Sequence, residues 1–196
     1  MNQFTCTVAA LLALCTLALA EDNKAKEGPV ALKLIAKTDK YKFDGGGKAP
    51  DEYRRDLEGL AAKAKKGELV RAPKPPAVDL VLQIVNTSKA DVTVQVGGDP
   101  NVFTFELTGG AGTVAMGSGL AFTADFRLPT AVTLAPGKSH DIPVKQLSDG
   151  SRGAARYVYW AGPGDYQLSA TYRLADQNGN PHTTLKSEPV KITVEK

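Results

Sequence analysis

Residues 163–174 read PGDYQLSATYRL, and their pattern indicates the fold class most clearly. Apolar residues stand at every second position from Tyr166 to Leu174, with polar residues between them. Successive side chains of a strand point to opposite faces, so this period of two predicts a β-strand with one buried face and one solvated face. The proline and glycine at its start are typical of a turn that leads into a strand.

The same period of two recurs along most of the chain. Leu80, Leu82 and Ile84 share one face of a segment, and valines alternate with polar residues at 92–96. Further short segments of strand character lie at residues 30–36, 102–107, 121–128, 131–134, 142–144, 157–160 and 190–194. About seven or more short strands separated by turn residues predict a mainly β fold, namely an antiparallel Ig-like β-sandwich.

One segment has a helical period. Residues 50–66 carry a proline and acidic residues at the start and lysines at the end, and Gly67 follows them. These signals predict a helix whose charges complement its dipole. Its apolar residues form one narrow stripe, namely Tyr53, Leu57, Leu60, Ala61 and Ala64. We therefore expect one amphipathic helix, inserted near the N-terminus and packed on its own domain, followed by a stiff proline-rich connector at 71–76.

The first twenty residues differ in composition from the rest of the chain. Residues 1–20 contain an apolar run without a charged residue and end in Ala-Leu-Ala, after which charge returns. This pattern predicts a signal peptide cleaved after Ala20, because the run is too short to span a bilayer. The alternatives are an uncleaved anchor and a lipoprotein signal at Cys15, where Leu14 takes the place of the small residue that such signals need.

The expected mature chain has one domain and no cysteine. A flexible lead-in at residues 21–29 precedes a single Ig-like domain at residues 30–196. Cys6 and Cys15 are the only cysteines, and both fall inside the expected signal peptide. The mature chain then has no disulfide and no thiolate metal site. Export without disulfides favours a bacterial protein of the periplasm, the cell envelope or the medium.

Three segments resemble parts of known bacterial domains. The P-G-x-Y-x-L-x-A pattern at residues 163–170 resembles the penultimate strand of bacterial Ig-like and fibronectin-like domains. Residues 133–139 and 80–88 resemble the turn and the early strand of the same domains. The chain is also similar to a set of uncharacterised secreted bacterial proteins. The resemblance implies that the hydroxyl of Tyr166 caps a loop.

The same three segments, together with Trp160, loosely resemble the BsuPI-type proteinase-inhibitor domain. This resemblance implies proteinase inhibition as an alternative function. An inhibitor needs a rigid exposed loop, and residues 148–155 are the candidate for it.

The charge of the chain is nearly balanced, with 24 basic and 21 acidic residues and a net charge of +3. Such a balance gives no strong attraction to nucleic acid or to an anionic membrane. We expect neither as a partner, and the pattern leaves the oligomeric state open.

No group of residues matches a catalytic, cofactor or metal motif. His140 and His182 are the only histidines, and Ser139 and Asp141 adjoin His140 too closely to form a triad with it in a strand. The glycine-rich residues 109–119 precede neither a helix nor a lysine, as a phosphate cradle would require. An enzyme with scattered carboxylates stays an alternative, with candidates Glu106, Asp125, Asp141 and Asp165.

The candidate interaction surface is an aromatic strip. In a strand, Tyr157 and Tyr159 share one face while Trp160 points to the other face, which we place in the core. Arg152 and Arg156 lie beside the two tyrosines in the sequence. Because tyrosine and arginine are favoured interface anchors, the sequence predicts an exported, non-enzymatic binding or structural module. Its expected partner is a protein or a carbohydrate of the cell envelope.

Overall fold

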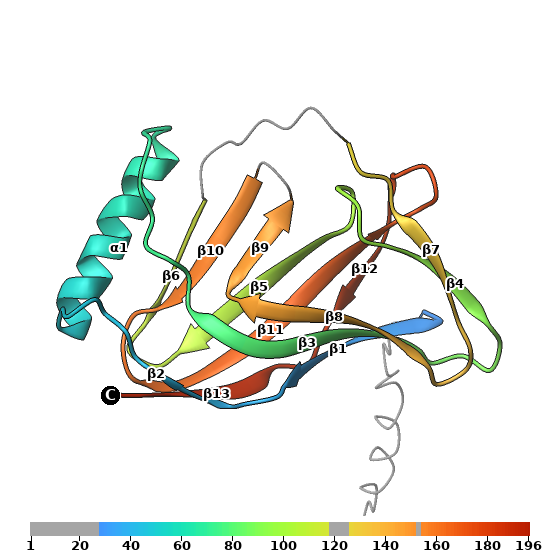
Figure 1. Cartoon of the computed structure of the whole chain (residues 1–196), viewed down its shortest axis with the longest axis horizontal. Coiled ribbons are helices and arrows are strands. Elements are labelled where there is room, and N and C mark those ends of the chain that lie inside the picture. The colour runs from blue at the N-terminus through green and yellow to red at the C-terminus, as the bar shows by residue number, and fades with distance from the viewer. Residues whose placement is uncertain (1–27, 118–125, 152–153) are drawn as a thin grey trace, which may run out of the picture.

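The structure, a computed structural model, describes residues 28–117, 126–151 and 154–196. Strands account for 54% of these residues and helix for 10%, so the prediction of a mainly β protein with one helix is confirmed. The strands form several antiparallel sheets (Figure 1). The predicted signal peptide, residues 1–20, lies outside the described residues.

The largest sheet is built around the stretch from which the fold was predicted. That stretch is β11 (Gly164–Ala175), and β5 (Val102–Gly109) pairs with one of its edges. Its other edge pairs first with β13 (Val190–Glu195) and then with β12 (Pro181–Lys186). β2 (Lys40–Lys42) adds a short parallel pair to β13. We call this group the β11 sheet.

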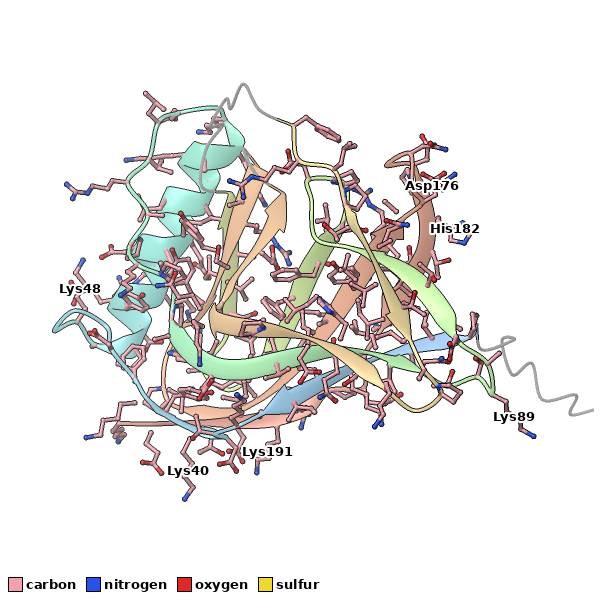
Figure 2. All side chains as sticks on the ribbon, turned by 45° about the vertical axis from the view of Figure 1, so that its right-hand side comes forward. Lys40, Lys48, Lys89, Asp176, His182 and Lys191 are labelled. Carbon is pink, nitrogen blue, oxygen red and sulfur yellow. The ribbon has the colours of Figure 1, made fainter. Side chains whose placement is uncertain are left out.

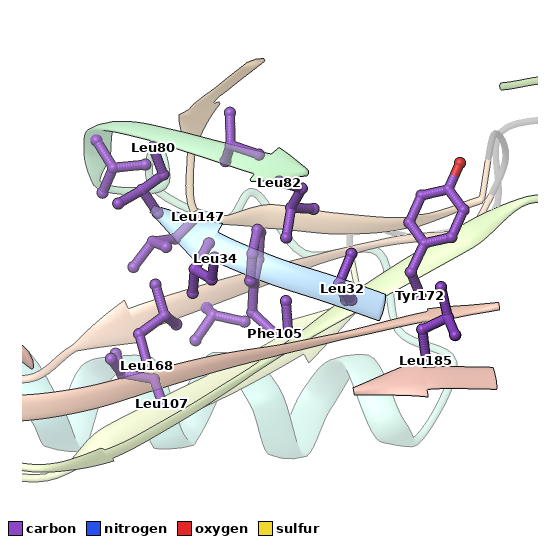
Figure 3. Packing of buried hydrophobic residues seen from close by; sticks show 14 of the residues in the cluster. Leu32, Leu34, Leu80, Leu82, Phe105, Leu107, Leu147, Leu168, Tyr172 and Leu185 are labelled. Atoms are coloured by element: carbon purple, nitrogen blue, oxygen red, sulfur yellow. The ribbon is translucent and has the colours of Figure 1, made fainter. Parts of the chain in front are cut away.

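A second sheet of three antiparallel strands contains β3 (Ala77–Asn86) between β1 (Val30–Ala36) and β8 (Ser139–Gln146). We call it the β3 sheet. Its inward side chains and those of the β11 sheet belong to one hydrophobic cluster, as Figure 3 shows for its leucines and for Phe105. The predicted inward face of β3 is confirmed, because no solvent reaches Leu80, Leu82 or Ile84.

Two smaller sheets lie at opposite ends of the molecule (Figure 1). β4 (Val92–Val96) and β7 (Thr130–Leu134) form a two-stranded ribbon at one end, which we call the ribbon end. β10 (Ala154–Trp160) pairs with β6 (Thr113–Gly117) and β9 (Ser148–Ser151) at the other end. The helix lies at this second end, which we call the helix end.

The helix is α1 (Pro50–Lys65), within one residue of the predicted range. Proline stands in its first turn, where a missing N–H costs nothing, and the acidic and basic residues lie at the expected ends. Leu57 is 1% exposed and packs with Val114, Met116 and Tyr159 in a second hydrophobic cluster. The prediction that the helix packs on its own domain is confirmed.

The described part of the glycine-rich segment, residues 109–117, forms a tight turn followed by a strand. Gly109 ends β5, and β6 begins at Thr113 after a tight turn. A side chain at Gly110 would meet the Tyr166 ring, because a Cβ there would lie 2.1 Å from its Cζ. The Tyr166 hydroxyl donates to the carbonyl of Gly162 at 2.6 Å and accepts from the N–H of Ala111 at 3.2 Å. The predicted loop-capping tyrosine is therefore confirmed.

Candidate functional site

The structure corrects the predicted aromatic strip. Tyr159 is fully buried under α1, and its hydroxyl donates to the carbonyl of Pro73 at 2.7 Å. Burial raises the pKa of Tyr159 well above its ordinary value. Tyr157 shares that face and is half-buried against the same cluster. From the alternation of β10 we expected this face to be exposed to solvent, but α1 covers it. Tyr159 therefore belongs to the core, and Tyr157 is half-buried.

Arg156 is also structural rather than a contact residue, and Arg152 lies outside the described residues. The Arg156 guanidinium bonds to both carboxylate oxygens of Asp149, at 2.9 and 2.7 Å. The Asp149 side chain is fully buried, and the bond with it raises the pKa of Arg156. A charge can be buried this deeply only if a partner compensates it.

This ion pair makes the hydrogen bonds to the backbone of Phe105 that a neighbouring strand would otherwise make with β5. The backbone N–H of Phe105 donates to Asp149 at 2.5 Å, and the carbonyl of Phe105 accepts from Arg156 at 2.5 Å. Both backbone groups face away from β11, where a further strand would otherwise bond to them. The pair therefore fastens the helix-end sheet to the β11 sheet and occupies this stretch of the edge of β5.

An open cavity lies at the ribbon end of the molecule. It is a groove of about 790 Å³, within the size range of known ligand sites. The ribbon supplies one wall, and β8 and the start of β5 supply others. Its apolar lining residues are Val96, Phe103, Val132, Ile142, Pro143 and Tyr172.

The floor of the groove is aromatic. Phe103 lies opposite Tyr172 across the β5–β11 pair, and the rings stack at 6.3 Å with 10° between their planes. Tyr172 is 2% exposed, and burial raises the pKa of its phenol. Phe103 is only half-buried, so its ring forms part of the accessible floor. An accessible aromatic ring on a rigid sheet is a suitable anchor for a bound apolar group.

The rim of the groove carries charges of both signs. Asp99, Arg127, His140 and Asp141 all line it. Asp99 accepts from the backbone N–H of Arg127 at 3.0 Å and donates its own N–H to the carbonyl of Arg127 at 2.9 Å. Asp141 accepts from the Gln83 amide at 2.9 Å. These bonds fix the two carboxylates and the backbone of Arg127 in place.

Two large apolar side chains project beside this rim. Phe126 and Leu128 flank Arg127 and are 66% and 67% exposed. We call residues 126–128 the rim segment. Among the residues that the structure describes, the other exposed large hydrophobic side chains are Ile35, at 39%, and Leu69, and neither lines the groove. Exposed apolar groups next to an apolar groove mark an interaction surface, whereas single ones are ordinary.

The remaining candidates do not converge on a second site. His140 lies in the groove, whereas His182 lies with Asp176 beyond the end of β11 (Figure 2). Asp165 and Glu106 pair with Lys191 and Lys186 on the outer face of the β11 sheet, and Asp125 lies outside the described residues. Within the part of the chain that the structure describes, no cluster of His, Cys, Asp or Glu could hold a metal ion.

Comparison with known proteins gives no relative: no family model, no curated protein and no solved structure matches this chain. Among residues 28–117, 126–151 and 154–196, no helix is long and apolar enough to cross a membrane.

Proposed function

We propose that this protein is an exported, non-enzymatic module of the bacterial cell envelope, with an Ig-like β-sandwich fold, that binds a protein through the groove. The apolar cluster shared by the β3 and β11 sheets supports the sandwich, since two facing sheets bury such a layer between them. The Tyr166 hydroxyl bonds support the Ig-like arrangement, in which a tyrosine holds a loop in this way.

The observation that carries the proposal is the groove with its exposed rim segment. Protein interfaces combine a desolvated apolar centre, often aromatic, with a polar rim. Phe103, Val132 and Ile142 supply the centre, and Asp99 and Arg127 supply the rim. Protein is favoured over carbohydrate as the partner because two large apolar side chains, Phe126 and Leu128, are exposed beside the apolar part of the lining.

The inhibitor alternative is less well supported. Its candidate loop, residues 148–155, is largely taken up by β9 and the start of β10, which pair with each other in the described part. The backbone groups engaged in that pairing are not free to bind a proteinase as an inhibitory loop does. Of the carboxylates named for the enzyme alternative, Asp141 lies in the groove. Hydrogen bonds from Gln83 and Ser139 already engage this carboxylate.

A capture experiment tests the proposal. Residues 21–196 carry a tag and are exposed to envelope and secreted fractions of the source bacterium, and the bound proteins are identified by mass spectrometry. We compare the natural chain with the double variant F126D/L128D, whose changed residues are exposed and leave the core intact. The control is L69D, which places one such charge at a fully exposed leucine outside the groove.

We expect a protein that the natural chain and L69D capture at a stoichiometric level and that F126D/L128D does not. Capture that is equal for all three chains contradicts the groove as a binding surface, and no capture at all contradicts an envelope protein as its partner. A proteinase that is captured and inhibited by all three chains would instead restore the inhibitor hypothesis.

A further inference from the structure

We infer that the groove binds the rim segment of a second copy of this chain, so that the protein forms a two-fold symmetric dimer. The inference rests on the proposed function, because it takes the groove as a protein-binding surface and names its partner. A two-fold interface uses the same patch on both copies, so that patch has to complement itself in shape and in charge.

The patch complements itself in shape. It contains an apolar groove of about 790 Å³ and, beside the groove, two projecting apolar side chains, Phe126 and Leu128. When two copies face each other across a two-fold axis, the projection of each copy meets the groove of the other. The half-buried ring of Phe103 then has its accessible part covered by an apolar side chain of the other copy.

The patch also complements itself in charge. Arg127 lies between the two projecting residues and lines the groove together with Asp99 and Asp141. Arg127 forms no ion pair with any residue that the structure describes. A partner with charges of one sign would be repelled by part of this rim. A second copy presents both signs, so the arginine of each can meet a carboxylate of the other.

The net charge of the chain permits self-association. It is +3, and residues 1–20 contain no charged residue, so the expected mature chain keeps the same value. A charge this small adds little long-range repulsion between two copies.

The test measures molar mass in solution. Residues 21–196 are examined by sedimentation equilibrium over about a hundredfold range of concentration, because dimerisation follows mass action. We expect the mass to rise toward that of two chains for the natural sequence and for L69D. F126D/L128D should keep the mass of one chain throughout. Circular dichroism that matches the natural chain shows that the double variant is folded.

A charge exchange tests the orientation of the two copies. R127E should weaken the dimer by roughly tenfold, since two symmetry-related ion pairs of moderate strength are lost. Combining R127E with D141R reverses both charges and should recover most of that loss. Failure of the double change to recover it contradicts pairing between these two positions.

Two results would overturn the inference. One is a natural chain that stays monomeric at every concentration, and the other is a dimer that F126D/L128D leaves intact, which would place the interface elsewhere. The dimer can also fail while the proposed function stands. A monomer that captures an envelope protein only when the rim segment is intact would reject the dimer and keep that function.

Discussion

Each end of the molecule has an aromatic pair, which a helix covers at one end and an open groove exposes in part at the other. At the helix end, Tyr157 and Tyr159 lie on one face of β10, and α1 covers them. At the ribbon end, Phe103 and Tyr172 lie side by side on the β11 sheet, and the ribbon leaves a groove above them. The difference shows that a covering element decides whether an aromatic pair stabilises the core or forms a surface.

The covering elements differ in size. The helix end has a helix of 16 residues whose apolar stripe lies over the strand pair. The ribbon end has two strands of five residues each. A two-stranded ribbon has little stability of its own and buries less surface than a helix of three or more turns. Three substitutions and one comparison of two carboxylates test this contrast. They are given in order of decreasing effect on the stability of the fold.

The largest effect should come from the ion pair that fastens the helix end to the β11 sheet. D149A leaves Arg156 without its partner and leaves the N–H of Phe105 without an acceptor. We expect a loss of about 3–5 kcal/mol in the free energy of unfolding, as for other buried pairs broken on one side. Urea denaturation followed by Trp160 fluorescence measures it. A loss below about 1 kcal/mol, the range of surface pairs, would show that the pair does not join the two ends.

This ion pair also shows what the sequence could not predict. The period of two correctly placed the inward side chains of β11 and β3, and the stripe of α1 correctly predicted its packing. Both are local patterns. Asp149 and Arg156 meet the backbone of Phe105, more than forty positions away, and no local pattern marks such a meeting.

The error at Tyr159 and the missed groove have the same cause. Alternation in a strand shows which side chains share a face, but not what covers that face. α1 precedes Tyr159 by about a hundred positions, and the groove needs β4, β5, β7, β8 and β11 together. One signal was present in the sequence: Phe103 and Phe105 alternate with polar residues, as Tyr172 does, which is typical of side chains that share one face of a sheet.

The next largest effect should come from uncovering the helix end. L57A removes a side chain that is 1% exposed from the contact between α1 and Tyr159. We expect a loss of about 3 kcal/mol, because a cavity is left where the helix met the sheet. Thermal denaturation by circular dichroism measures it. L60A is the control, since Leu60 belongs to the same stripe but is only partly buried, and it should cost less.

A smaller effect should follow the equivalent change at the ribbon end. F103A truncates a ring that is half-buried and faces the groove. We expect a loss of about 1–2 kcal/mol, below the roughly 3–5 kcal/mol of a fully buried phenylalanine. Partner capture, or dimerisation, should fall much more than stability does. A stability loss larger than that of L57A would mean that Phe103 belongs to the closed core and not to a binding surface.

The smallest effect compares two carboxylates at opposite ends of β11. Asp165 lies at the helix end, where bonds from Lys191 and Thr193 lower its pKa below 3.8. Asp176 follows β11 at the ribbon end, where bonds from Asn180 and from the N–H of Asn178 lower its pKa below the same value (Figure 2). Each carboxylate therefore stabilises the fold above its unfolded-state pKa, and this contribution is lost as the pH falls through the lowered folded-state value.

Salt should separate these two carboxylates. At about 1 M salt the screening length is about 3 Å, so the charge of the exposed Lys191 is screened, whereas fixed backbone N–H groups are affected much less. We expect the pKa of Asp165 to rise toward 3.8 and that of Asp176 to stay low, measured by carbon-13 NMR titration of the side-chain carboxyls. In K191M the pKa of Asp165 should be raised already at low salt. If the pKa of Asp165 stayed as low in salt as that of Asp176, Thr193 and not the lysine charge would hold Asp165, and both ends of β11 would fix their acids by neutral hydrogen bonds.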